Sequence, residues 1–229
     1  MKRDHAFLGL LIAGDLLLVG LHLLHIYSRY FSDIGISSYM FSLTHDGGVG
    51  EIYQYLKMYW IVLLLVGVSV RSGKLAYLSW TFLFLFLLLD DSLQIHEQLG
   101  AIVSSRMGYT AALHLRAQDL GELTVVCLAG LFLGSLLSLT CWRGDPQFRR
   151  ISRDLALLVG LVVLFVVGID MLHGISDIDA VIAARALLED GGEIVAMSFV
   201  CWYVYRVFLQ GEGEDWLGQD HGPDPSGAS

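Results

Sequence analysis

The sequence has 229 residues, of which 55% are hydrophobic and only 16% are charged, and its formal net charge is −9. A soluble domain carries about 25% charged residues, so this composition excludes an ordinary soluble globular protein. The acidic balance leaves no basic face, which also excludes a nucleic-acid-binding protein.

Long apolar runs recur along the whole chain. A run of about 20 apolar residues matches the thickness of a bilayer core, and a helix is the form in which such a run satisfies its own backbone. The first run follows "MKRDH" and has no small-residue cleavage site, so we interpret it as a retained signal anchor. We therefore predict an all-α polytopic membrane protein with a transmembrane domain over residues 1–209. Its six spans are 6–27, 55–70, 75–95, 121–141, 155–175 and 192–209.

The distribution of lysine and arginine predicts the topology. In a six-span arrangement, one side holds Lys2, Arg3, Arg71, Lys74, Arg143, Arg149, Arg150, Arg153 and Arg206. The other side holds Arg29, Lys57, Arg106, Arg116 and Arg185. The positive-inside rule then places both termini in the cytoplasm of a plasma-membrane protein. Residues 210–229 are polar and rich in Gly and Pro, so we predict a disordered cytoplasmic tail.

Acidic and histidine residues gather at the outer ends of the predicted spans. In chain order these are His22, His25, Glu51, Asp90, His96, Glu97, Asp119, Glu122, Asp170, His173, Asp190 and Glu193. Glu51, Glu122 and Glu193 each follow a glycine and lie 71 residues apart. This repeat favours three tandem helical hairpins, each bringing a histidine and a glutamate to the same end.

Helix capping is the alternative explanation for part of this pattern. Asp119 with Glu122, and Asp190 with Glu193, have the spacing of capping boxes at helix starts, where negative charge also complements the helix dipole. Capping does not explain Asp90, Glu97 and Asp170, which lie near predicted helix C-termini. Asp15 lies near the middle of the first span. Carboxylates inside a membrane are costly and mark functional sites.

The acids outnumber the arginines near them, which are Arg106, Arg116 and Arg185. A bound metal would compensate this charge, and mixed carboxylate and imidazole ligands suit iron, manganese or zinc. The three cysteines are too scattered for a disulfide framework or a thiolate metal site. The ligand set is similar in style to the dinuclear carboxylate sites of helical bundles. We expect the metal ligands to be His22, His25, Glu51, Asp90, His96, Glu122, Asp170, His173 and Glu193, with Glu97, Asp119 and Asp190 in catalytic roles.

The leading functional hypothesis is a metal-dependent oxidoreductase of the membrane that acts on a lipid-like or quinone-like substrate, with two iron or manganese ions at the outer end of the bundle. Zinc would instead favour hydrolysis of an ester or amide. Haem ligated by His96 and His173 is a further alternative, as is an ion or metal transporter that uses Asp15. The last is a structural subunit of a larger complex. Expected partners are membrane lipids and an amphiphilic small molecule, and a homo-oligomer stays open.

Overall fold

The computed structural model describes residues 2–30, 39–45, 47–111, 115–165 and 179–217. Within these residues the chain forms seven α-helices and a short 3-10 helix, and no strand. The prediction of an all-α fold is therefore confirmed. In chain order the elements are α1 (Lys2–Tyr30), η1 (Tyr39–Phe41), α2 (Val49–Ser72), α3 (Tyr77–Leu93), α4 (Ile95–Met107), α5 (Ala117–Arg143), α6 (Pro146–Val163) and α7 (Asp179–Leu217).

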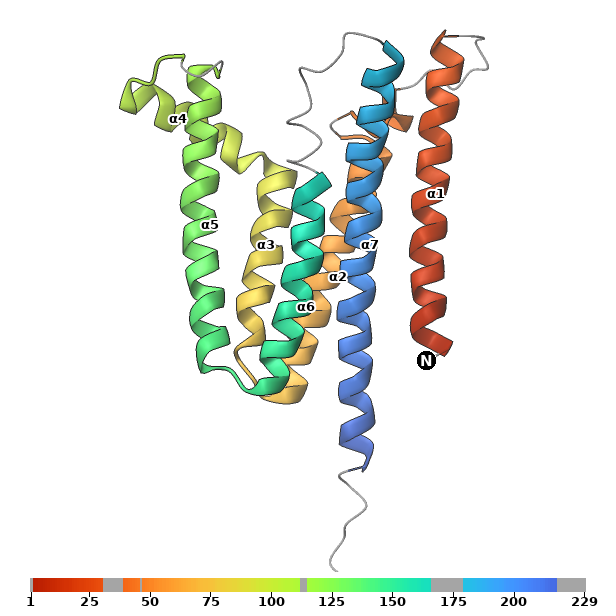
Figure 1. Cartoon of the computed structure of the whole chain (residues 1–229), viewed down its shortest axis with the longest axis vertical. Coiled ribbons are helices and arrows are strands. Elements are labelled where there is room, and N and C mark those ends of the chain that lie inside the picture. Colours follow the sequence, from red (N-terminus) through yellow and green to blue (C-terminus); the bar gives the residue numbers. More distant parts are fainter. Residues whose placement is uncertain (1, 31–38, 46, 112–114, 166–178, 218–229) are drawn as a thin grey trace, which may run out of the picture.

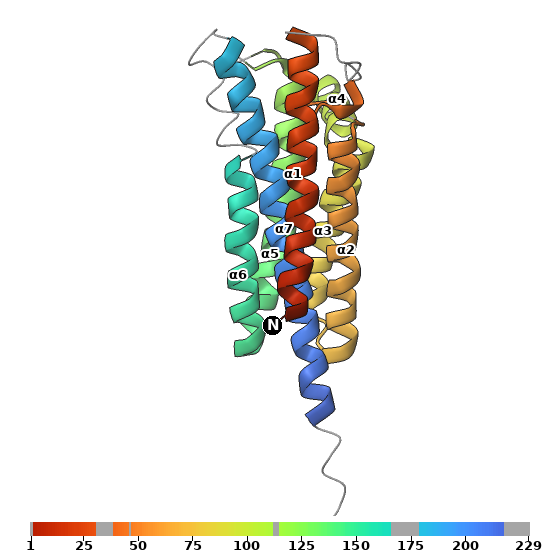
Figure 2. The ribbon, with the colours of Figure 1, turned by 90° about the vertical axis from the view of Figure 1, so that its right-hand side faces the viewer.

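Six of the helices lie side by side in an elongated bundle, and α4 lies across one end of it (Figure 1). We call the end that holds the start of α1 and the last turns of α7 the proximal end. The opposite end, where α1 finishes and α2 begins, is the distal end. Figure 2 shows the same bundle from the side of α1, which packs mainly against α7. Successive helices of the bundle run in opposite directions, so each connection joins two helices at the same end.

Four helices are long and apolar enough to cross a membrane: Arg3–Ser28, Val49–Ser72, Ala117–Arg143 and Leu187–Gln210. A fifth candidate is the pair α3 and α4, which is bent by 75° at Gln94. Gln94 adopts a left-handed conformation, with φ of 50°, and this breaks the helix. The described residues thus give four or five candidate spans, and six spans are not confirmed.

Two predicted spans differ from the helices that form. The predicted span 155–175 extends beyond the described part of α6, which begins at Pro146 with Asp145 as its N-cap. Asp145 accepts a hydrogen bond from the backbone N–H of Phe148 at 3.2 Å. Proline suits the first helical position because it has no N–H that would need an acceptor. The predicted span 192–209 lies inside α7, which already begins at Asp179. The predicted start of that helix is therefore wrong.

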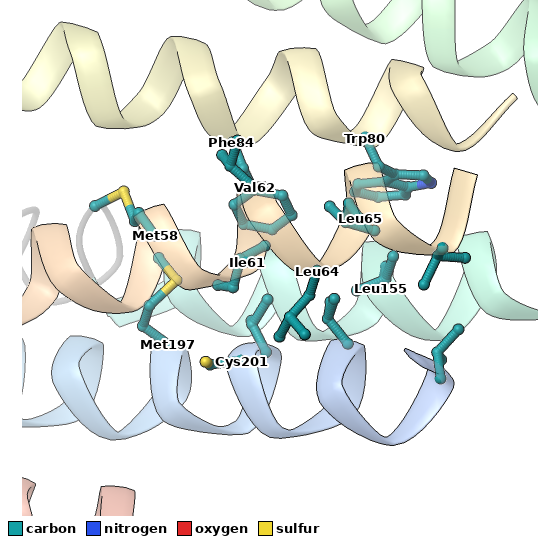
Figure 3. Packing of buried hydrophobic residues seen from close by; sticks show 14 of the residues in the cluster. Met58, Ile61, Val62, Leu64, Leu65, Trp80, Phe84, Leu155, Met197 and Cys201 are labelled. Atoms are coloured by element: carbon teal, nitrogen blue, oxygen red, sulfur yellow. The ribbon is translucent and has the colours of Figure 1, made fainter. Parts of the chain in front are cut away.

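The core lies between α2, α3, α6 and α7. Figure 3 shows Ile61 and Leu65 of α2 facing Phe84 and Trp80 of α3, with Leu155 of α6 beside them. Many apolar side chains of α5 are exposed instead, and Phe132 is 69% exposed. A face this apolar and this exposed suits a lipid surrounding rather than water.

Candidate functional site

A lysine is buried in the middle of the bundle. Lys57 of α2 is 1% exposed and Asp15 of α1 is fully buried, and their Nζ and Oδ1 atoms lie 3.2 Å apart. The ammonium group also donates to the backbone carbonyl of Ile194 at 2.6 Å and to the hydroxyl of Ser198 at 3.2 Å, both in α7. All three donors of the lysine are thus used, and three helices are held together through one side chain.

The aromatic ring of Tyr53 completes the surroundings of this ion pair. Its centroid lies 4.7 Å from Lys57 Nζ, a cation–π distance, and its hydroxyl donates to the carbonyl of Leu11 at 3.1 Å. The second carboxylate oxygen of Asp15, Oδ2, is buried and has no hydrogen-bond partner among the described atoms. The site therefore holds a compensated charge pair that keeps one free acceptor.

A second polar contact lies one helical turn closer to the distal end. The side-chain amide of Gln54 donates to Oε1 of Glu193 at 3.0 Å, which joins α2 to α7 again. Gln54 is only 4% exposed, and its carbonyl oxygen Oε1 has no partner among the described atoms. A buried acceptor without a donor costs free energy, so this position favours a ligand that offers positive charge or a hydrogen.

Gln54 and Glu193 form the floor of a polar cavity of about 180 Å³ at the distal end, which we call the distal pocket. Its lining includes four carboxylates and no lysine or arginine of the described chain, and every polar side-chain atom that it presents belongs to a carboxylate, an amide or a hydroxyl. The full lining is Thr44, Gly50, Glu51, Gln54, Asp91, Asp190, Glu193 and Ile194. Glu51 accepts hydrogen bonds from the Gly47 N–H and the Tyr55 hydroxyl, which hold it at the rim.

The predicted histidine ligands of α1 do not line the distal pocket. Nδ1 of His22 accepts a hydrogen bond from the backbone N–H of Leu43 at 3.1 Å, so the ring is neutral with its proton on Nε2. His25 packs against the ring of Tyr39, with 6.0 Å between ring centroids. Both side chains are 4% exposed and anchor the η1 segment to α1. Their described contacts are structural.

Asp90 and His96 form a pair across the bend between α3 and α4. The backbone N–H of His96 donates to Asp90 Oδ1 at 2.9 Å, and its ring nitrogen Nδ1 lies 3.0 Å from Oδ2. This carboxylate satisfies an N–H of the first turn of α4, so it caps the helix that follows the bend. Glu97 lies in the same turn, partly exposed.

The two acidic pairs that have the spacing of capping boxes lie at different positions in their helices. Asp119 caps α5 from the third helical position: it accepts from the backbone N–H of the N-cap residue Arg116 at 2.8 Å and from its guanidinium at 2.7 Å. Capping thus explains Asp119, but the box forms with Arg116 and not with Glu122 as predicted. Asp190 and Glu193 lie well inside α7 and cap nothing, so that interpretation is wrong for them. Glu122 accepts from Gln118 at 2.8 Å at the contact of α4 with α5, apart from the distal pocket.

Within the described residues, no three His, Cys, Asp or Glu side chains come close enough together to hold a metal ion. Of the predicted ligands that the structure describes, only Glu51 and Glu193 line the distal pocket, together with Asp190, for which we predicted a catalytic role. Asp170 and His173 lie outside the described residues. The arrangement of nine ligands expected from the sequence is thus not assembled by the residues that the structure describes.

An apolar groove opens on the surface of the bundle between α1, α2 and α7. Its volume is about 470 Å³, and exposed side chains such as Leu10, Leu17 and Trp60 form its edges. Tyr53 and Lys57 reach its inner wall. The groove therefore connects the lipid-facing surface with the buried ion pair.

Sequence reasoning missed Lys57 as a member of the site, because Lys57 entered the analysis only as one of the basic residues counted on the outer side of the membrane. The signal was present: a lysine inside the apolar run of residues 55–70 is costly unless it is paired. Gln54 and Ser198 gave no signal, since uncharged polar residues are common in membrane helices. Asp15 was identified as an intramembrane carboxylate, but its partner was not.

The model of one protein family, described as "Domain of unknown function (DUF8692)", matches residues 10–207. The match covers the bundle and all the side chains of the distal pocket and the ion pair. No curated protein matches the chain. No solved structure matches it either.

Proposed function

This chain belongs to the DUF8692 family, and we propose that it is an integral-membrane protein that binds a cation in the distal pocket. In this proposal six spans cross the plasma membrane, both termini are cytoplasmic, and the distal end faces outward. The basic residues of the proximal end support that orientation. A short α3 and a partly charged α6 complete the six, because the helices alternate in direction (Figure 1).

The observation that carries the proposal is the free carbonyl oxygen of Gln54. Its amide nitrogen donates to Glu193, and the oxygen is buried without a donor in a residue that lines the pocket. Four carboxylates line the same cavity, and negative charges that share a cavity are stabilised by protonation or by a cation among them. A bound cation would satisfy both conditions.

The chemistry of the lining selects the class of cation. Carboxylate, amide and hydroxyl oxygens are the ligands of hard ions such as Ca²⁺, Mg²⁺ and Mn²⁺. A water molecule occupies about 30 Å³, so a cavity of about 180 Å³ has room for an ion that keeps part of its water shell. Binding through water fits side chains that do not converge on one point.

The pocket is connected to the ion pair but not to the proximal end. Glu193 precedes Ile194, whose carbonyl holds Lys57, so a charge at Glu193 acts on the Lys57–Asp15 pair. On the proximal side of Lys57 the bundle is filled by apolar side chains, among them Ile61, Leu65 and Val200, each at most 1% exposed. This geometry supports a site that loads from one side rather than a continuous pore.

The test is cation binding to the purified full-length protein in detergent, measured by calorimetry with Ca²⁺, Mg²⁺ and Mn²⁺ in turn. Glu193→Gln should weaken binding about tenfold, a loss of about 1.4 kcal/mol. Glu122→Gln is the matched control, because Glu122 also follows a glycine but lies outside the pocket. Absence of binding for all three ions, or an equal loss in both variants, would overturn the proposal.

A metal-dependent oxidoreductase stays the second candidate, and the Asp90–His96 pair favours it. A carboxylate on Nδ1 orients the imidazole and leaves Nε2 free to bind a metal. The groove beside Lys57 would admit a lipid-like or quinone-like substrate from the membrane. Elemental analysis for iron, manganese and zinc, with a visible spectrum for haem, tests this candidate. Protein free of all these metals and of haem would eliminate it.

A further inference from the structure

Two neighbouring cavities surround the last turns of α7 at the proximal end. Their volumes are about 250 and 360 Å³. They share a wall made of Gln147, Ile151, Val207 and Gln210, and we call them together the proximal basin. The end of α7, beyond these residues, extends past the other helices (Figure 1).

The basin is positively charged. Arg71 and Lys74 line the first cavity, and Arg150 and Arg206 line the second. The acid in the lining, Asp154, is already engaged: it accepts from the Arg153 guanidinium at 2.9 Å and from the Tyr203 hydroxyl at 3.0 Å. Among the described side chains of the lining, four are therefore cationic and one is a carboxylate, Asp154, which Arg153 and Tyr203 already engage.

Two of these cations keep their hydrogen-bonding capacity. Lys74 is occupied by Asp145 and Gln147, and the Arg71 guanidinium stacks over the ring of Phe208 at 4.0 Å. Within the part of the chain that the structure describes, Arg150 and Arg206 donate to no carboxylate, although Arg206 lies near the Trp202 ring. A guanidinium that is free to donate binds a phosphate through two parallel hydrogen bonds.

The basin also has an apolar side. Val68, Tyr77 and Phe208 line the first cavity, and the first two are at most 7% exposed. Charged groups above an apolar wall, at the level where the spans end, match an amphiphilic anion better than a water-soluble one.

We propose that the proximal basin binds the head group of an anionic phospholipid, with the phosphate between Arg150 and Arg206 and the acyl chains along the apolar wall. The site is independent of the cation in the distal pocket. It depends only on the proximal end lying at the membrane surface. Neutral phospholipids carry the same phosphate, but their ammonium group would meet the basic lining, so selectivity follows from charge.

The experiment uses the full-length protein, delipidated in a neutral detergent. Thermal unfolding is followed while phosphatidylglycerol, phosphatidylcholine or inorganic phosphate is added. The midpoint temperature of unfolding should rise as the phosphatidylglycerol concentration increases. The double variant Arg150→Gln/Arg206→Gln should bind this lipid at least tenfold more weakly. Arg143→Gln is the matched control, because this exposed arginine lies at the same end but lines neither cavity.

Four outcomes would overturn the proposal. Equal stabilisation by phosphatidylcholine would remove the selectivity for anionic lipid. Equal stabilisation by inorganic phosphate would mean that the basin binds a free anion instead. Unchanged binding in the double variant, or an equal loss in Arg143→Gln, would mean that the arginines of the basin do not form the site. Native mass spectrometry of retained lipid gives a readout for a variant that melts too early.

Discussion

A lysine in the apolar middle of a bundle is stable only while its charge is compensated. Lys57 has an aspartate, a carbonyl and a hydroxyl around its ammonium group, and Asp15 depends on the same contact for its charge. Removing one partner of a buried pair leaves an uncompensated charge, whereas replacing both with apolar residues removes the desolvation cost as well. The effects of replacing Lys57 and Asp15 on the free energy of unfolding should therefore not be additive.

Lys57→Met should lower the free energy of unfolding by about 3–5 kcal/mol, because it leaves Asp15 buried without its cation. The double variant Lys57→Met/Asp15→Leu should recover most of that loss. Denaturant unfolding in mixed micelles measures both. A double variant as unstable as the single one would show that the two side chains are not coupled.

Asp145 has a milder role at the protein surface. It caps α6 and binds Lys74, and the hydrogen bond from the Lys74 ammonium holds the pKa of the Asp145 carboxyl below its usual range. Asp145→Ala should cost about 1 kcal/mol through the lost cap. Asp145→Asn keeps an acceptor for Phe148 and loses only an exposed ion pair, which contributes less than about 1 kcal/mol.

The dependence on pH separates the two contributions of Asp145. A lowered pKa in the folded state stabilises the protein above the ordinary carboxylate pKa, and this stabilisation is lost as the pH falls through the lowered value. The difference between wild type and Asp145→Asn should therefore be present at pH 7 and shrink as the pH falls below the ordinary carboxylate pKa of about 3.9. A constant difference across that range would contradict an ionic contribution.

At the scale of the elements, the contact of α4 with α5 depends on two glycines. A Cβ at Gly121 would lie 2.1 Å from the carbonyl oxygen of Gly100, and a Cβ at Gly100 would meet the backbone of Glu122 at 2.6 Å. Backbone atoms cannot give way as a side chain does. The bend at Gln94 directs α4 across the end of the bundle, and these two glycines allow its backbone to pack closely against α5.

Gly121→Ala should therefore separate α4 from α5 and cost about 1–3 kcal/mol, the usual range for overpacking. Gly130→Ala and Gly134→Ala are controls in the same helix, since a Cβ at either position meets nothing within 4 Å. Alanine there should be neutral or slightly stabilising. Thermal unfolding compares the three variants, and equal midpoints would refute the role given to Gly121.

The elements also show what sequence periodicity can and cannot predict. Long apolar runs identified α1, α2, α5 and most of α7, because a helix that crosses a bilayer needs about 20 consecutive apolar residues. The bend at Gln94 was missed, since a single left-handed residue has no apolar signature. The start of α7 was also missed: "LEDGGE" has the composition of a helix start, but packing of α7 against α1 and α2 carries the helix through it.

The candidate site was predicted in part. The acids that gather at the distal end were identified by type and by end, and Glu51, Asp190 and Glu193 do share one pocket. The repeat of 71 residues suggested that Glu122 would join them, yet α5 lies at the other side of α3 and takes Glu122 to α4 instead. Spacing along the chain predicts the end of the bundle that a residue reaches, but only packing decides its neighbours.

At the scale of the whole molecule, the open question is how many helices cross the membrane. Four helices have sufficient length and hydropathy by themselves, whereas α3 and the described part of α6 do not. The bundle nonetheless alternates in direction through both of them, since α2 and α5 both end proximally and α7 begins distally (Figures 1 and 2). The proposal of six spans rests on this alternation, in which α3 and α6 each return the chain from the proximal to the distal end.

This argument predicts a labelling pattern for single cysteines placed in a chain whose own Cys127, Cys141 and Cys201 are replaced by serine. Tyr39→Cys and Met107→Cys should react with a membrane-impermeant maleimide on intact cells, because both lie at the distal end. Gln147→Cys and Gln210→Cys should react only after permeabilisation. If α3 did not cross, Met107 would change sides relative to Tyr39. If α6 did not cross, Gln147 and Gln210 would lie on opposite sides, so each short helix is tested by its own pair of residues.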